Sequence, residues 1–261
     1  MDSDTLYFAL ELIAGSGQTL NVEQRTALQT SLLLLRKDYK FQRVLFWGKI
    51  FGLKQDYFIT QGRGEDEMED IKYFYSFNCI DWFLLPMVTD TMVQEVSTAA
   101  KGRFMGDPSH VYQHVETKVS EESRLAVAVL QIDEEASVVP RGAFVKNPHG
   151  LVQVNRSFGG LSYSEASKVD NFLHFSKPKN LKKKSILEMA DLNPTTDFLD
   201  VLSDDIPNGC WSLQFECASR VCILRSLLWL GLTFYHVPMT PQHGYIYIGH
   251  GAKNLDLPFM L

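Results

Sequence analysis

The chain has 261 residues, of which 45% are hydrophobic and 21% charged, so it can bury a sizeable core. Asp and Glu number 31 against 25 Lys and Arg, and the net charge of −6 argues against nucleic-acid phosphates or anionic lipid as the main partner. No apolar stretch approaches the ~20 residues of a membrane helix, no signal segment opens the chain and the four cysteines match no zinc pattern, so we expect a reduced, intracellular protein.

Two amphipathic helices are predicted at the start of the chain. Ser3 or Asp4 can cap the first helix, and Asn21 with Gln24 three residues later forms a capping box for the second. Apolar residues then recur with the helical period of 3.6. The expected inward positions are Leu6, Leu10 and Ile13 in the first helix and Leu28, Leu32, Leu35 and Tyr39 in the second.

Aromatic and β-branched residues predict strands after these helices. The stretch RVLFWGKIFGLKQDYFITQG, which begins at Arg43, predicts two paired strands around Gly52, and residues 72–77 predict a third. Between them, residues 65–70 hold five acids in six positions. We expect this acidic run on an exposed loop or helix start, where it is either solvated or turned toward an assembly partner.

The middle of the chain combines a segment of ambiguous type with a hairpin. Residues 121–133 suit a helix through Leu125, Val129 and Ile132 and a strand through Leu125, Val127 and Val129, and the acidic residues at both ends favour the helix. The strings GAFVK and LVQVN flank four turn-forming residues at 147–150, which predicts a hairpin.

A further helix is predicted where Ser162 and Glu165 form a second capping box. Its expected inward residues are Ala166, Val169, Phe172 and Leu173. From Pro178 to Pro207 the chain is polar and lysine-rich, and short helices are expected at 182–190 and 197–202.

Four strand-like runs close the chain: WSLQFECA, RVCILRS, LWLGLTFYH and GYIYIG. Their short separations predict an antiparallel meander. The fold class is therefore α+β, with N-terminal helices, central hairpins and a C-terminal antiparallel β-meander. We expect a single domain over 1–261, made of a helical and hairpin half at about 1–176, a surface connection at about 177–209 and the meander at about 210–261.

The terminal stretch GYIYIGHGAKN resembles a nucleotide-binding loop at first sight. A dinucleotide fingerprint needs a third glycine, a following helix and a later acid, whereas Asn254 occupies the third position and only seven residues follow it. The glycines Gly249 and Gly251 are better explained as a turn that lets LDLPFML dock its leucines and Phe259. In the preceding strand, Tyr245 and Tyr247 face one side and Ile246 and Ile248 the other, and one of these faces is expected to be buried.

Other candidate chemistry is weak. His110 and His114 would share a helical face, but no third ligand stands nearby, and Asp107-Pro108 favours a turn. A basic cluster at Lys177, Lys179 and 182–184 lacks interleaved stacking aromatics, so a solvated face or an acidic protein partner explains it better than nucleic acid. Nucleophile and Walker motifs are missing, so no catalytic, cofactor-binding or metal-binding residue is predicted.

Five strings together carry a resemblance: RVLFWGKIFGL at 43–53, KGRFMGDPS at 101–109, VVPRGAF at 138–144, RSLLWLGLTFYH at 225–236, and the terminal GYIYIG with NLDLPFML. In this order, over nearly the whole chain, they resemble the radial spoke head family of the ciliary and flagellar axoneme. Two places depart from the family pattern. Leu230 stands where proline is usual, and the connection from His114 to Arg124 is short.

The resemblance implies a non-enzymatic structural subunit of the radial spoke head in the axonemal cytoskeleton, which helps to transmit signals between the central pair and the dynein arms. Its implied partners are relatives of spoke head proteins four and six, the head protein built of repeated hairpins, the stalk protein and, transiently, central-pair projections. It implies no cofactor, no nucleic acid and no membrane. The alternative is a soluble cytosolic enzyme or ligand-binding domain with a site built from scattered residues.

Overall fold

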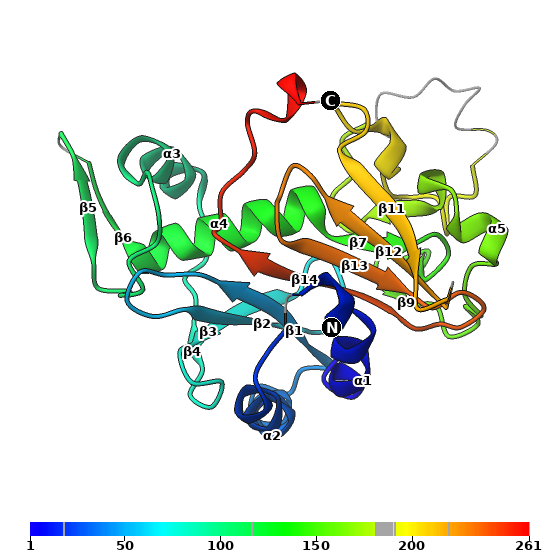
Figure 1. Cartoon of the computed structure of the whole chain (residues 1–261), viewed down its shortest axis with the longest axis horizontal. Coiled ribbons are helices and arrows are strands. Elements are labelled where there is room, and N and C mark those ends of the chain that lie inside the picture. The colour runs from blue at the N-terminus through cyan, green and yellow to red at the C-terminus, as the bar shows by residue number, and fades with distance from the viewer. Residues whose placement is uncertain (18, 116, 181–189, 191, 219, 261) are drawn as a thin grey trace.

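Aromatic and β-branched segments from both ends of the chain form one eight-stranded sheet in the order β11-β12-β13-β14-β1-β2-β3-β4 (Figure 1). The computed structural model describes residues 1–261 except 18, 116, 181–189, 191, 219 and 261. Neighbouring strands are antiparallel except for β1 and β14, which are parallel. The strands are β1 (Arg43–Ile50), β2 (Tyr57–Arg63), β3 (Ile71–Ser76), β4 (Phe83–Leu84), β11 (Trp211–Glu216), β12 (Val221–Ser226), β13 (Leu232–His236) and β14 (His243–Gly249).

Helices cover both faces of this sheet (Figure 1). The α-helices are α1 (Leu6–Leu12), α2 (Val22–Asp38), α3 (Asp90–Ala99), α4 (Glu121–Ala136) and α5 (Tyr163–Ala166). Three two-stranded ladders lie outside the main sheet: β5 (Val111–His114) with β6 (Thr117–Ser120), β7 (Val138–Pro140) with β10 (Phe172–His174), and β8 (Phe144–Lys146) with β9 (Val152–Val154). This arrangement confirms the α+β class and the C-terminal meander of β11 to β14. Within the described residues, none of the helices combines the length and apolarity that crossing a bilayer requires.

The core has two layers, one on each side of the sheet. The helices α1 and α2 pack on one face, against alternate residues of the strands such as Phe46 and Ile246. The helix α4 crosses the other face, against Trp47, Tyr245 and Tyr247. Both faces of β14 are therefore buried, whereas only one was expected, because a central strand between two helical layers has no solvent side.

Local signals placed several elements correctly. The capping box of Asn21 and Gln24 begins α2, and the predicted pair of strands around Gly52 is β1 and β2. The segment of ambiguous type is the helix α4, whose Ser120 side chain accepts a hydrogen bond from the Ser123 N–H. Of the predicted inward residues of the first two helices, Tyr39 alone is largely exposed.

Other predicted boundaries are wrong. The N-cap of α1 is Thr5, in place of Ser3 or Asp4, and its side chain forms no capping bond. The helix that starts at the Ser162 capping box ends at Ala166, because residues 172–174 pair with β7 as the strand β10. No helix spans 197–202: residues 197–201 are not helical, and a 3-10 turn begins at 202. The helix expected at 182–190 lies almost entirely outside the described residues.

The parallel pairing of β1 and β14 requires glycine at position 48. Gly48 lies opposite Tyr247 beside a β-bulge and has φ of +150°, and a Cβ atom there would lie 1.9 Å from the Tyr247 carbonyl oxygen. We expect Gly48→Ala to lower the free energy of unfolding by about 2–3 kcal/mol, because two central strands must separate to admit the methyl group. Urea unfolding followed by tryptophan fluorescence measures this change.

A matched control is Gly159→Ala, because a Cβ atom at Gly159 meets no heavy atom within 4 Å. This variant should unfold within about 0.5 kcal/mol of the unmodified chain. Equal stability of the two alanine variants would show that β1 and β14 can move apart freely.

Candidate functional site

The glycine-rich end of β14 is not arranged as a phosphate loop. Gly251 has φ of +66° and donates its N–H to the Tyr247 hydroxyl at 2.8 Å, so it turns the chain. Among the described residues that follow the glycines, Leu257–Phe259 form a 3-10 turn and none is α-helical. The prediction that this tail docks its apolar residues is correct for Leu257, which is buried, and wrong for Leu255 and Phe259, which are 75% and 90% exposed. Leu261 lies outside the described residues.

The two histidines considered as metal ligands are not on a helix. His114 ends the strand β5 and His110 precedes that strand, so the i, i+4 face on which the pairing depends does not form. The His110 ring lies against Tyr112, with the ring centroids 4.8 Å apart. Among the described residues, no group of three or more His, Cys, Asp or Glu side chains could hold a metal ion.

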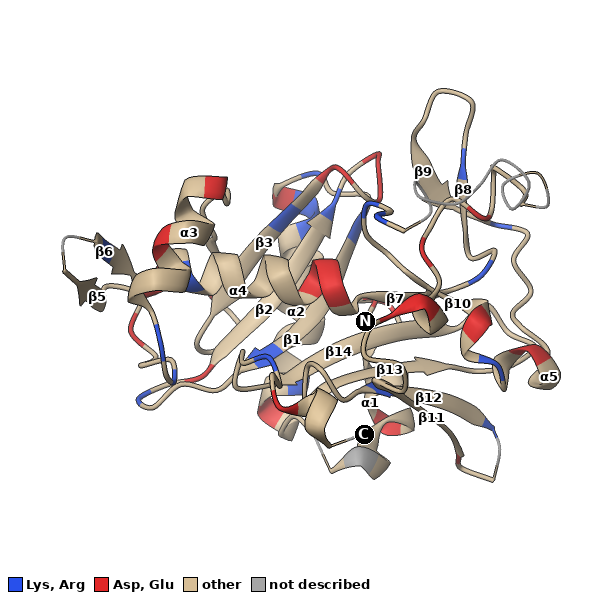
Figure 2. Cartoon of the chain, turned by 90° about the horizontal axis from the view of Figure 1, so that it is seen from above, with Lys and Arg blue, Asp and Glu red and all other residues tan. Residues whose placement is uncertain are grey.

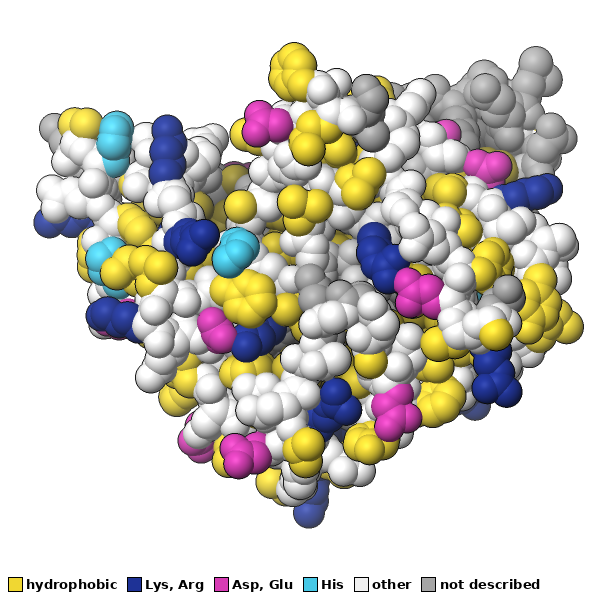
Figure 3. Space-filling view, viewed as in Figure 1, with side chains coloured by type: hydrophobic (Ala, Val, Ile, Leu, Met, Phe, Trp, Pro, Cys, Tyr) yellow, Lys and Arg dark blue, Asp and Glu magenta, His cyan; other side chains and the backbone are white. Residues whose placement is uncertain are grey.

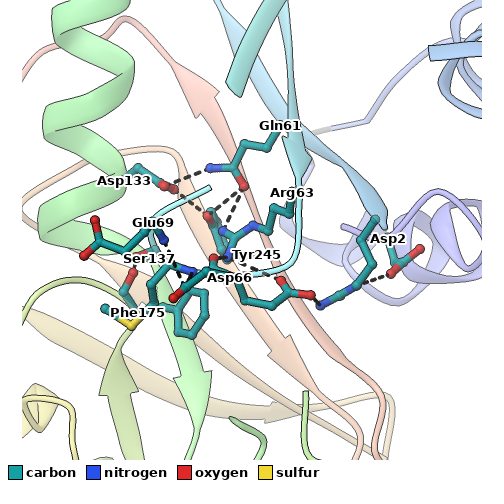
Figure 4. Close-up of polar contacts among 12 residues, drawn as sticks. Asp2, Gln61, Arg63, Asp66, Glu69, Asp133, Ser137, Phe175 and Tyr245 are labelled. Carbon is teal, nitrogen blue, oxygen red and sulfur yellow. Dashed lines mark hydrogen bonds and ion pairs between the residues drawn. The ribbon is translucent and has the colours of Figure 1, made fainter. Parts of the chain in front are cut away.

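Asp133 of α4 is the centre of a buried polar network against the sheet (Figure 4). Its carboxylate accepts hydrogen bonds from Trp47 Nε1 at 3.2 Å, Gln61 Nε2 at 2.8 Å, the Tyr73 hydroxyl at 2.6 Å and the Tyr245 hydroxyl. Burial and the nearby Asp133 charge raise the pKa of both tyrosines well above 10, so both remain protonated donors. Each carboxylate oxygen is satisfied by two donors, which makes the network a structural anchor.

The same network continues from Gln61 through Arg63 of β2 to the N-terminal segment of the chain (Figure 4). Arg63 donates to Gln61 Oε1 at 3.1 Å and to the Glu67 carbonyl oxygen at 2.6 Å. The Glu67 carboxylate accepts from Arg43 at 3.1 Å, and Arg43 also bonds Asp2 at 3.0 Å. Together these contacts tie α4, the strands β1, β2, β3 and β14, and the N-terminal segment to one another.

The acidic run at residues 65–70 is thus only partly exposed. Glu67 and Asp66 are buried, in contrast to the expectation of a solvated run. Glu67 is paired with two arginines from strands, and Asp66 accepts hydrogen bonds from the Met68 and Glu69 N–H groups. Glu69 forms an ion pair at 3.0 Å with Lys177, which belongs to the predicted basic cluster. Residues 182–184 of that cluster lie outside the described part of the chain.

Glu121, the first residue of α4, is a second buried hub. Its carboxylate accepts from the backbone N–H groups of Met105 at 2.7 Å, Gly106 at 2.6 Å and Asp107 at 3.0 Å. It also accepts from the hydroxyls of Tyr57, at 2.7 Å, and of Tyr112. Burial opposes ionisation of this carboxyl, but these five donors outweigh it and lower its pKa.

Three of the strings that carry the family resemblance supply hydrogen-bond donors to these hubs: Trp47 and Tyr245 to Asp133, and residues 105–107 to Glu121. The segments 43–53, 225–236 and 244–249 contribute the neighbouring strands β1, β13 and β14. The segment 101–109 is the loop that Glu121 holds, and it covers the turn after β1, where Leu53 N–H donates to the Phe104 carbonyl oxygen at 2.9 Å. The resemblance therefore marks the part of the molecule that fixes its shape.

In Figure 2, the positions of Lys and Arg and those of Asp and Glu are distributed over many of the described elements. Apolar side chains reach the surface at the C-terminal tip, at the top of Figure 3. They also line a groove of about 1030 Å³ between α2 and residues 80–83, which follow β3. Exposed apolar surfaces such as this groove and the C-terminal tip are typical of sites that contact other proteins.

The sequence did not predict the groove, because its second wall comes from residues 80–83, which are distant from α2 in the chain. A signal was present in the run Leu32–Leu35 of α2. A helix can turn only part of such a run inward: Leu32 and Leu35 are buried, while Leu33 and Leu34 are about half exposed. Four leucines in a row therefore predict that some of them face solvent or a partner.

Comparisons with known proteins agree with the resemblance. A family model described as "Radial spokehead-like protein" matches residues 4–124. The chain is 58% identical to the "Radial spoke head protein 9 homolog" of Danio rerio, 50% to that of Homo sapiens and 49% to that of Mus musculus, with 100% of both chains covered in each case. The chain therefore belongs to the radial spoke head protein 9 family.

Proposed function

We propose that the chain is a non-enzymatic structural subunit of the radial spoke head in the ciliary and flagellar axoneme. The observation that carries this proposal is the full-length similarity to proteins named radial spoke head protein 9 homolog. A subunit of an assembly needs a fixed shape and exposed surfaces that partners can cover. The rigid sheet between two helical layers and the apolar surfaces at α2 and at the C-terminal tip meet both needs.

The polar clusters support a structural role over a catalytic one. The carboxylates of Asp133 and Glu121 are saturated by donors from the chain itself, so neither is free to transfer a proton. The cysteines Cys79, Cys210 and Cys222 are buried, and burial raises the pKa of each thiol to between about 11 and about 12. Thiols of this kind are poor nucleophiles.

The proposed partners are other spoke head subunits, namely relatives of spoke head proteins four and six, the hairpin-repeat head protein and the stalk protein beneath. The head would contact central-pair projections and pass mechanical signals to the dynein arms. In this role the subunit contributes a stable body of defined shape, and the surfaces that its partners cover fix its position in the head.

Fractionation of cilia tests this function. A tagged chain expressed in ciliated cells should stay with the axoneme when detergent removes the membrane and matrix, and it should leave together with spoke subunits at high salt. Loss of the chain should reduce ciliary motility. A chain that leaves with the detergent-soluble matrix, without spoke subunits, would contradict the proposal and favour a soluble enzyme or binding protein.

A further inference from the structure

We propose that the groove between α2 and residues 80–83 binds an amphipathic helix of another spoke subunit, a helix that carries Lys or Arg beside its apolar face. This inference rests on the proposed function and adds to it a docking surface and the chemistry of its partner. It is argued from the shape of the groove, from the apolar side chains that line it and from its charge.

The shape of the groove fits a helix. One wall is a face of α2, whose lining residues recur every four positions over its 17 residues, a length of roughly 25 Å. The other wall is formed by residues 80–83. A second helix laid along α2 would place side chains at i, i+4 and i+7 between these walls, at the 8–10 Å spacing usual for packed helices.

Three of the apolar side chains that line the groove lie outside the buried core. Leu34 is 55% exposed, Ile80 60% and Phe83 51%. The inward face of α2 is already filled by Leu28, Leu32 and Leu35, so the packing of α2 on the sheet does not require Leu34 to be apolar. A contiguous apolar patch of this kind on a folded chain is typical of a contact surface.

Strand addition is a poorer explanation for this surface. The edge strand β4 has two residues, Phe83 and Leu84. Phe83 pairs with Tyr75, and the Leu85 N–H already bonds the Tyr73 carbonyl oxygen at 2.9 Å, which leaves the backbone of Leu84 alone pointing outward. One residue offers too few hydrogen bonds to align an added strand.

The charge of the groove selects a basic partner. Glu23, Asp38 and Asp81 line it, and none of the described residues that line it is Lys or Arg. None of these three acids forms an ion pair with another residue that the structure describes. In a symmetric pair of identical chains the same acids would face each other, so their repulsion disfavours a second copy as the occupant.

Photo-crosslinking in assembled axonemes tests the proposal. A benzoylphenylalanine placed at Leu34 of the full chain should, on irradiation, form one dominant crosslink to a different spoke subunit. The crosslinked segment should show apolar residues at helical spacing with Lys or Arg beside them. The same probe at Ile206, which is 89% exposed and lies outside the groove, should not give this product. A crosslink to a second copy of the chain, or to an acidic or extended segment, would overturn the proposal. So would a crosslink yield at position 34 no higher than the yield at position 206.

Matched variants provide a second measurement. Leu34→Glu with Ile80→Glu changes two exposed positions, so the variant should fold normally but enter axonemes at least about tenfold less than the unmodified chain. Ile206→Glu is the control and should assemble normally. Charge reversal at Glu23, Asp38 and Asp81 should also reduce assembly. Normal incorporation of the Leu34 and Ile80 variant would contradict the docking role.

The two proposals fail separately. If the unmodified chain is absent from axonemes, the proposed function is wrong and the docking inference falls with it. If the chain is present in axonemes with spoke subunits but position 34 gives no specific crosslink, only the docking inference is wrong.

Discussion

Replacement of Asp133 with alanine is expected to lower the free energy of unfolding by about 4 kcal/mol or more. The substitution leaves Trp47 Nε1, Gln61 Nε2 and two tyrosine hydroxyls buried without their acceptor, and each such group costs about 1–3 kcal/mol. It also removes one of the two carboxylates, Asp133 and Glu67, whose negative charges favour the charged form of buried Arg63. Because folded domains are stable by only about 5–15 kcal/mol, a loss of this size removes roughly a quarter or more of the stability.

Urea unfolding of the purified chain measures this effect, and two further variants make it specific. Glu134→Ala lies one residue away on the exposed side of α4 and should change the stability by less than about 0.5 kcal/mol. Asp133→Asn keeps one carbonyl oxygen, and the tyrosine hydroxyls can turn to accept from its amide, so its loss should be intermediate. If the alanine variant were as stable as the Glu134 variant, the network would not be the anchor of α4.

Replacement of Glu121 with alanine is expected to cost about 3–5 kcal/mol, because five donors lose one acceptor group. Glu121→Gln should cost less at pH 7, since it retains one oxygen. The loop at 104–107 should become more accessible in both variants. Hydrogen exchange of the Gly106 amide relative to the core strands reports this opening directly.

The same carboxylate predicts a dependence of stability on acid. The pKa of Glu121 is lower in the folded chain than in the unfolded chain, where it is about 4.3. Its contribution is therefore fully present above the unfolded pKa and is lost as the pH falls through the folded pKa. Between pH 5 and pH 3 the unmodified chain should lose stability more steeply than Glu121→Gln. Glu122→Gln, which removes a carboxylate that accepts a single hydrogen bond at 3.3 Å, should keep the steep slope.

The parts of the fold that local chemistry determines were predictable from the sequence. The capping box of Asn21 and Gln24 lies within one helical turn, and the strands β1 and β2 are joined by a short connection. Elements that depend on distant partners were not. Phe172 and Leu173 have helical spacing after Ser162, but pairing with β7 draws them into a strand. Glu67, which lies between β2 and β3, is buried because it forms ion pairs with Arg43 of β1 and Arg63 of β2.

The candidate site was predictable only in outline. The family resemblance, which rests on strings spread over the whole chain, predicted that the protein is a radial spoke component. The groove itself needs residues 80–83 to lie beside α2, and no local pattern in either segment specifies that approach. The neighbouring positions of β14 and β1 are equally non-local.

The parallel pairing of β1 with β14 also means that the central sheet can be completed only late in the synthesis of the chain. The strand β1 leaves the ribosome early, but its edge stays unpaired until residues 243–249 have been made, a wait of roughly 10–40 s at 5–20 residues per second. Over that time an apolar central strand is open to wrong pairing and offers a natural binding site for chaperones. A chain cut short before β14 would keep that edge exposed, and the cell should degrade it before it reaches the cilium.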